Sequence, residues 1–218
     1  MNDQRQEIES MLRAGISQLN IDYDDQKINK LCEYLQLLSK WNATHNLTAI
    51  DDDPKEMITL HLHDSISILH AIKGSRVLDV GSGAGLPGII IAIFFPDIQV
   101  FSIDTRGKKI QFQTLAASTL ELDNFHPIQD RVEQYQTDEL FDQVISRAFS
   151  NLNNFIAWSK HLIKNDGEWL AMKGQLPTTE IEDLEIHQGM QAQKIEKLNV
   201  PNLEADRHLI TIVPQQKS

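Results

Sequence analysis

The chain has 218 residues and a mass of 24.8 kDa, with 41% hydrophobic residues and a net charge of −11, which suits one acidic α/β domain with an extension. That charge excludes a broadly basic protein that binds nucleic acid without specificity, so an RNA partner would have to meet a local basic patch. The single cysteine, Cys32, excludes an internal disulfide framework, and the polar start without a long apolar run leads us to expect a cytoplasmic protein with neither a secretory signal nor a membrane span.

The first 75 residues are predicted to form a helical extension. Apolar residues recur at helical spacing over 3–19 and 24–41. Residues 41–48, WNATHNLT, are rich in asparagine and threonine, which favour turns over helix interiors, so we expect a structured loop there. Asp53 and Pro54 then supply an N-cap and a first-turn proline for a third helix, which should run to about residue 72.

The third helix carries His61 and Asp64, three residues apart and therefore on one face. A metal site would need further ligands, which this region lacks. We therefore expect a hydrogen-bonded structural pair.

From residue 76 onward the pattern alternates between strands and helices, which indicates a largely parallel, twisted sheet built from right-handed crossovers. Residues 76–218 are thus expected to form a Rossmann-like core that shares one structural domain with the extension. A turn is predicted at residues 165–167. The strands are expected at 76–80, 99–103, 125–129, 143–146, 168–172, 194–200 and 208–213, with intervening helices ending at Pro96 and covering about 108–120, 152–163 and 178–186.

The glycine-rich stretch after the first strand, RVLDVGSGAGLPG, allows two interpretations. Gly83 to Gly88 fits G-x-G-x-x-G, the fingerprint of dinucleotide-binding proteins. Counted from the strand, however, the motif reads D-x-G-x-G-x-G, with Asp79 followed by Gly81, Gly83 and Gly85. A carboxylate at that point would repel a pyrophosphate and suits a cofactor with a cationic amino-acid tail. This second form resembles the first motif of Rossmann-like S-adenosylmethionine methyltransferases.

Polar and charged residues follow the other predicted strands, where open α/β sheets bind their ligands. Asp104 lies 19 residues after Gly85, close to the spacing of an acidic residue that binds ribose hydroxyls, although it could also be a plain N-cap. Val132 and Glu133 follow the third strand, where Val132 could lie against an adenine ring. Three cations are expected at the same edge of the sheet: Arg131, Arg147 and Lys173. They could form a basic rim around the binding site, or they could be solvated charges paired with acidic residues.

Several motifs together resemble the bacterial glucose-inhibited division protein B family, whose members are guanine-N7 methyltransferases of small-subunit ribosomal RNA. The motifs are WNATHNLT, HLHDS, LDVGSGAGLPG, KK-x-x-F, DRVE, ISRAF, MKGQ and RHL. The chain departs from the family at Leu60, where a basic residue is expected, and in its acidity. The resemblance implies cofactor contacts at Gly81, Leu86, Val132, Glu133 and Arg147, and basic RNA positions at Arg131, Lys173 and Arg207.

The resemblance also implies the reaction, which is methyl transfer from S-adenosylmethionine to N7 of a guanine in the 530 loop of 16S ribosomal RNA. N7 carries an unprotonated lone pair, so no general base is needed, and none is evident in the sequence. We expect Arg147 to order the cofactor pocket and Lys173 and Arg131 to hold RNA phosphates or the guanine edge. The RNA could be free or part of the small subunit, and we expect a monomer with no membrane or DNA partner.

Three alternatives remain. A methyltransferase of a small substrate would accept the negative charge more easily. A nicotinamide oxidoreductase is disfavoured by Asp79 and the position of Gly81. A non-catalytic factor that senses the cofactor while it binds maturing ribosomal subunits is the third.

Overall fold

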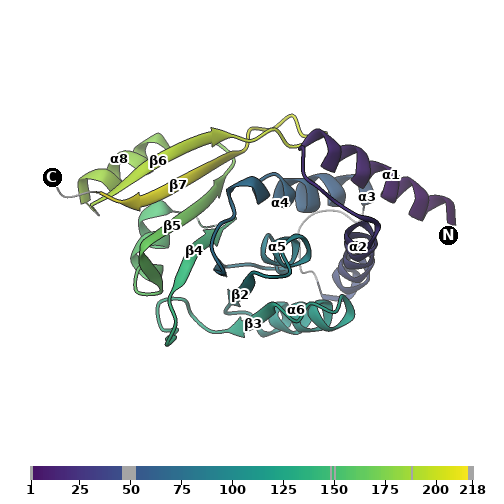
Figure 1. Ribbon diagram of the computed structural model, residues 1–218, viewed down its shortest axis with the longest axis horizontal. Helices are drawn as coiled ribbons and strands as arrows, with labels where there is room; N and C mark the ends of the chain where they lie inside the picture. The colour runs from purple at the N-terminus through teal and green to yellow at the C-terminus, as the bar shows by residue number, and fades with distance from the viewer. Residues whose placement is uncertain (1, 46–52, 148, 150, 188, 216–218) are drawn as a thin grey trace.

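The computed structural model describes residues 2–45, 53–147, 149, 151–187 and 189–215 (Figure 1). Its centre is one seven-stranded sheet in the order β3-β2-β1-β4-β5-β7-β6. β1 pairs in parallel with β2 and β4, whereas β7 runs antiparallel to β5 and β6. The strands are β1 Arg76–Val80, β2 Gln99–Asp104, β3 Phe125–Gln129, β4 Phe141–Ser146, β5 Ile163–Lys173, β6 Met190–Lys197 and β7 His208–Pro214.

Helices cover both faces of this sheet, and none of those in the described residues combines the length and the apolar character of a membrane span. The fold class predicted from the alternating pattern is confirmed. The helical elements are α1 Asn2–Gln18, α2 Asp25–His45, α3 Pro54–Met57, the π-helix η1 Ile58–His63, α4 Asp64–Ile66, the 3₁₀-helix η2 Leu69–Ala71, α5 Gly88–Phe94, α6 Gly107–Thr119, α7 Leu152–Ser159 and α8 Thr178–His187.

Two predictions in the N-terminal extension were wrong. The loop expected at 41–48 is helical as far as His45, because the Thr44 hydroxyl donates to the Trp41 carbonyl (3.1 Å) and the Trp41 ring packs on Phe112. The remaining residues of that loop lie outside the described part. The single helix expected after Pro54 is divided into α3, η1, α4 and η2.

Two strand predictions also needed correction. The turn expected at 165–167 lies within β5, whose pairing with β4 is irregular there: Ile163 pairs with Phe141, and the next pair is Glu168 with Gln143. The extra residues form a bulge, which turn-type sequence alone does not distinguish from a loop. β6 begins at Met190, four residues before its expected start.

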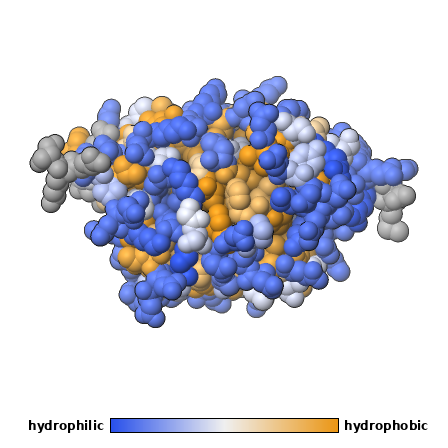
Figure 2. Space-filling view, in the orientation of Figure 1, coloured by the Kyte–Doolittle hydropathy of each residue, from blue (hydrophilic) through white to orange (hydrophobic). Residues whose placement is uncertain are grey.

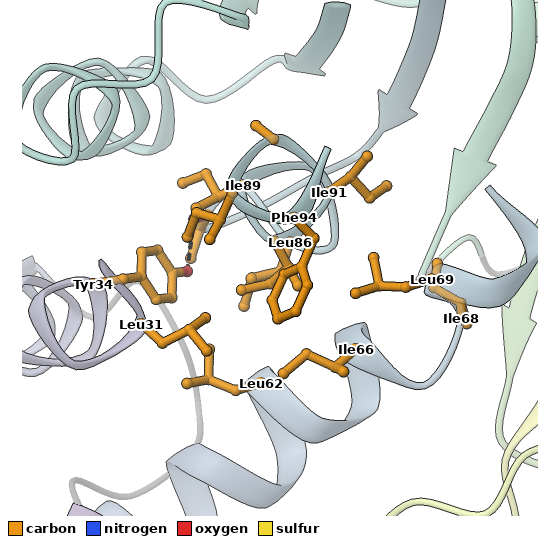
Figure 3. Close-up of a cluster of buried hydrophobic side chains, with 14 of the residues drawn as sticks. Leu31, Tyr34, Leu62, Ile66, Ile68, Leu69, Leu86, Ile89, Ile91 and Phe94 are labelled. Carbon is orange, nitrogen blue, oxygen red and sulfur yellow. Dashed lines mark hydrogen bonds between the residues drawn. The ribbon is translucent and has the colours of Figure 1, made fainter. Parts of the chain in front are cut away.

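The N-terminal helices share a hydrophobic core with the glycine-rich region (Figure 3). Leu31 and Tyr34 of α2 and Leu62 of η1 face Leu86 and α5, and all of them are buried. The Tyr34 hydroxyl donates to the Ala84 carbonyl at 2.9 Å. A second core, on the other face, contains α7 and α8. The extension therefore supports the turn that follows β1.

The surface facing the viewer in Figure 2 is mainly hydrophilic at its margins, whereas apolar atoms reach it near the centre, where α5 lies end-on in Figure 1. α5 itself, GIIIAIF, is apolar throughout, and all seven residues are buried. A helix that is hydrophobic on all sides must be covered on all sides. The sheet covers one side, and α2 with the 58–66 segment covers another.

Two buried histidines lie in the π-helical segment. Burial, together with the nearby charge of Arg147, lowers the pKa of His61 to about 3. Burial also lowers the pKa of His63, whose ring packs directly against Gly15 of α1. A Cβ atom at Gly15 would lie 2.1 Å from Nε2 of His63. Gly15 is therefore the point at which α1 can approach the segment.

Gly15→Ala should lower the melting temperature. In an exposed helix this change is stabilising by up to about 1 kcal/mol. Here the added methyl group meets the fully buried His63 ring, and overpacking of this kind costs about 1–3 kcal/mol, or a fall of roughly 2–12 °C for a chain of this size. Thermal unfolding measures the effect, with Ser10→Ala on the exposed face of α1 as the control. An unchanged or higher melting temperature in Gly15→Ala would contradict this packing.

Candidate functional site

The turn between β1 and α5 leaves open space at the carboxyl edge of the sheet. Gly81 has a φ of 69°, and a Cβ built there meets no atom of the described residues within 4 Å, so these residues leave room for a ligand to approach the backbone. Gly85, with a φ of 85°, is needed for a different reason, since a Cβ there would lie 2.6 Å from the Ile89 side chain. Leu86 is buried below the turn.

Asp79 lies beneath this turn and is fully buried. Its Oδ2 accepts the Gly88 N–H at 2.8 Å, whereas its Oδ1 accepts no hydrogen bond from the described residues. Burial raises the pKa of Asp79 to about 7, against the lowering effects of the Gly88 N–H and of the Arg147 charge. The carboxylate thus stands at the expected place, and its Oδ1 is a buried atom without a hydrogen-bond partner among the described residues.

Asp104 joins the end of β2 to the same turn. One carboxylate oxygen accepts the Gly83 N–H at 3.1 Å and the other accepts the Arg106 N–H at 3.0 Å. Lys109 of α6 lies 3.5 Å from Asp104, so the carboxylate has a cationic partner. Asp104 therefore fixes the distance between two neighbouring loops.

The residues after β3 divide into a buried and an exposed part. Val132 is buried in the second core, with Val80 and Ile103 from the ends of β1 and β2. Arg131 and Glu133 form an exposed ion pair at 2.9 Å. This pair stands apart from the other predicted cations, because β3 and β5 are separated by three strands, or about 19 Å at the usual spacing.

Arg147, at the end of β4, forms a cluster that the sequence did not predict. Its Nη1 atom donates to the Leu60 carbonyl at 3.2 Å and lies 3.7 Å from Oδ2 of Asp64. Oδ1 of Asp64 accepts from Nε of Arg207 at 3.1 Å. The pair expected between His61 and Asp64 was therefore wrong: within the described residues, Asp64 is paired with two arginines.

Lys173, at the end of β5, is held by an acidic partner from α8. Its ammonium group lies 3.1 Å from Oε2 of Glu180 and donates to the Phe149 carbonyl at 3.1 Å. The same Glu180 oxygen accepts the N–H of Leu152, the first residue of α7. Glu180 was missed because its only sequence signal is an acidic residue in the first turn of a helix, which is common on protein surfaces.

Comparison with known proteins gives a consistent result. A family model described as "GidB: rRNA small subunit methyltransferase G" matches residues 27–210. A protein of that name from Methylobacillus flagellatus is 46% identical over 96% of this chain and 100% of its own length. The Legionella pneumophila protein of the same name is 45% identical over 94% of both chains.

Solved structures resemble the fold at much lower identity. A glycopeptide N-methyltransferase crystallised with S-adenosylmethionine has a TM-score of 0.60 at 8% identity, over 71% of this chain and 87% of its own. A methyltransferase from Aquifex aeolicus that depends on the same cofactor has a TM-score of 0.58 at 15% identity, over 77% and 97%. The strand order, the glycine turn and the near full-length relatives agree, and the chain belongs to the rRNA small subunit methyltransferase G family.

Proposed function

We propose that the chain transfers the methyl group of S-adenosylmethionine to N7 of a guanine in the 530 loop of 16S ribosomal RNA. The observation that carries this proposal is the open glycine turn at the end of β1, flanked by Asp79 and Asp104, in a chain of this family. The RNA could be recognised free or within the small subunit, by a monomer acting in the cytoplasm. We also propose that the extension, 1–75, and the core, 76–218, act as one structural domain, in keeping with their shared hydrophobic core.

The residues at this edge suit the cofactor by the chemistry of its parts. The space beside Gly81 can admit an amino-acid tail, whose cationic amine would pair with Oδ1 of Asp79, an atom that accepts no hydrogen bond from the described residues. Asp104 offers a carboxylate for ribose hydroxyls, and Val132 with Glu133 would border the adenine. Arg147, which donates within the described residues only to the Leu60 carbonyl, is suited to the tail's carboxylate.

The reaction requires no general base from the protein. The bound cofactor supplies an electrophilic methyl group on a sulfonium, and guanine N7 offers its lone pair without losing a proton. The chain's own residues therefore have to bind, to orient and to exclude water. In this proposal the protein accelerates the reaction by positioning the reactants. The low pKa of the buried His61 agrees with this, because its ring is neutral at physiological pH and adds no charge beside Arg147.

The RNA is proposed to meet cations on two sides of the cofactor turn. Lys173 and Arg207 lie on the side of β5 and β7, and Arg131 lies on the side of β3. Because Arg131 and Lys173 are about 19 Å apart by strand spacing, each would contact a different phosphate rather than the same guanine. The pairing of Lys173 with Glu180 means that an RNA phosphate has to share or replace this partner.

Lys173→Ala should reduce methyl transfer by about tenfold or more while S-adenosylhomocysteine binding stays nearly unchanged, because a charge-assisted phosphate contact is worth about 1.5–3 kcal/mol. The assay offers labelled S-adenosylmethionine with unmethylated small subunits, with naked ribosomal RNA and without RNA. Lys164→Ala is the matched control, since Lys164 lies on the same strand at the opposite end of the sheet, paired with Asp142.

Wild-type label should appear in subunit or free RNA as N7-methylguanosine. Binding of the cofactor without any incorporation would instead support the sensing factor, and label in another molecule would support another substrate. Unchanged turnover in Lys173→Ala would remove Lys173 from the RNA site.

The proposed contact of Asp79 predicts a pH-dependent cofactor affinity. Because the pKa of Asp79 is raised to about 7, this carboxyl group is largely protonated at pH 6 and must lose its proton to bind a cationic amine. The affinity for S-adenosylhomocysteine should therefore rise roughly five- to tenfold between pH 6.0 and 7.5, below the pKa of about 7.7–8.0 of an α-amino group. Calorimetric titration measures this, and Asp79→Asn should flatten the profile. A wild-type affinity that does not change with pH would refute the contact.

A further inference from the structure

We infer that Asp64 is a positioning residue for this reaction: its carboxylate holds Arg147 and Arg207 together and aims Arg147 at the glycine turn. The inference rests on the proposed roles of the two arginines. Asp64 comes from the N-terminal extension, Arg147 from the end of β4 and Arg207 from the loop that enters β7. In Figure 1 the segment with α4 lies between α5 and that loop. One carboxylate thus joins three distant parts of the chain.

The burial of Asp64 makes its pairing obligatory. The residue is only 3% exposed, and burial raises the pKa of its carboxyl group while the two arginines lower it. An uncompensated carboxylate at this depth would cost several kcal/mol, so the position is stable only with cations around it. The arginines are therefore not merely near Asp64. They are required by it, and their side chains are held where it places them.

The two arginines are held in different ways. Arg207 donates a hydrogen bond from Nε to Asp64 at 3.1 Å and another from Nη1 to the Asp206 carbonyl at 2.9 Å. Arg147 lies at 3.7 Å from the other carboxylate oxygen, beyond hydrogen-bond length, and within the described residues it donates only to the Leu60 carbonyl. A guanidinium has five N–H donors. The Asp64 carboxylate thus attracts Arg147 without using all of its N–H donors, and the remaining donors can bind a ligand.

The charges of this cluster do not cancel. Two guanidinium groups face one carboxylate, which leaves one positive charge in surplus, while Lys173 nearby is balanced by Glu180. The Arg147 charge reaches Asp79 beneath the turn, since it lowers the pKa of that residue. Asp64 therefore keeps the surplus charge close to the cofactor turn.

The test compares Asp64→Asn with Asp142→Asn. Asp142 is a partly buried carboxylate that accepts the backbone N–H groups of Ser75 and Arg76, and it lies at the opposite end of the sheet from Asp64. Asp64→Asn should weaken S-adenosylhomocysteine binding about tenfold, and should lower kcat by up to about 100-fold through misplacement of Arg147. Asp142→Asn should lower the melting temperature without changing either quantity. Equal affinities in wild type and Asp64→Asn would overturn the inference.

A double-mutant cycle separates this inference from the proposed function. Arg147→Ala should weaken S-adenosylhomocysteine binding, and adding Asp64→Asn should then cause no further loss, because Asp64 acts through Arg147. Full additivity would show that Asp64 acts on its own and would overturn the inference alone. An unchanged affinity in Arg147→Ala would instead overturn the proposed cofactor contact, and the inference with it.

Arg207→Gln keeps the test open if Asp64→Asn does not fold. Arg207 is partly exposed and belongs to the proposed RNA side. If Asp64 did not link the two arginines, replacing Arg207 would leave the affinity for S-adenosylhomocysteine unchanged. If Asp64 links the two arginines, the loss of Arg207 lets the carboxylate draw Arg147 into hydrogen-bond contact and away from the turn. S-adenosylhomocysteine binding should then weaken measurably, by about threefold. An unchanged affinity in this variant would count against the link.

Discussion

A carboxylate can be buried in a protein only if cations or hydrogen-bond donors accompany it, and Asp64 applies this constraint to three distant segments. Its two arginine partners come from the end of β4 and from the loop before β7, whereas Asp64 itself belongs to the N-terminal extension. The extension is further held on the core by the packing of α2 on α5. The helices before residue 76 are therefore part of the site's construction, since they place one of its charged groups.

Under the proposed function, the same cluster accounts for an acidic chain that acts on an RNA substrate. The net charge of −11 opposes RNA binding at long range, but screening limits that effect to about 10 Å at ordinary ionic strength. In the cluster itself, two arginines share one carboxylate, that of Asp64. Guanidinium groups held by a buried acid are also ordered in advance, which reduces the entropic cost of binding. In this account the RNA meets a few fixed cations rather than a broad basic surface.

The sequence predicted the fold well because its signals were local. Apolar runs followed by glycine or ending in aspartate defined β1 and β2 within a residue, and the weaker, mixed run before Asp130 defined β3. The D-x-G-x-G-x-G spacing indicated the open turn. What it could not predict were pairings across the chain. Nothing local shows that Asp64 faces arginines rather than His61, or that Lys173 meets Glu180. The π-helical segment after Pro54, which shares a core with α1 and α5, also carries no sequence signal that we identified.

The salt dependence of RNA binding tests the account's central claim most directly, because each neutralised phosphate adds a fixed amount to the slope. Contacts with Arg131, Lys173 and Arg207 alone predict a slope of about −2 to −3 for the logarithm of the binding constant against the logarithm of the salt concentration. A slope of about −6 or steeper would require an extended basic surface. That result would contradict the account of an acidic chain that holds its RNA by a few fixed cations.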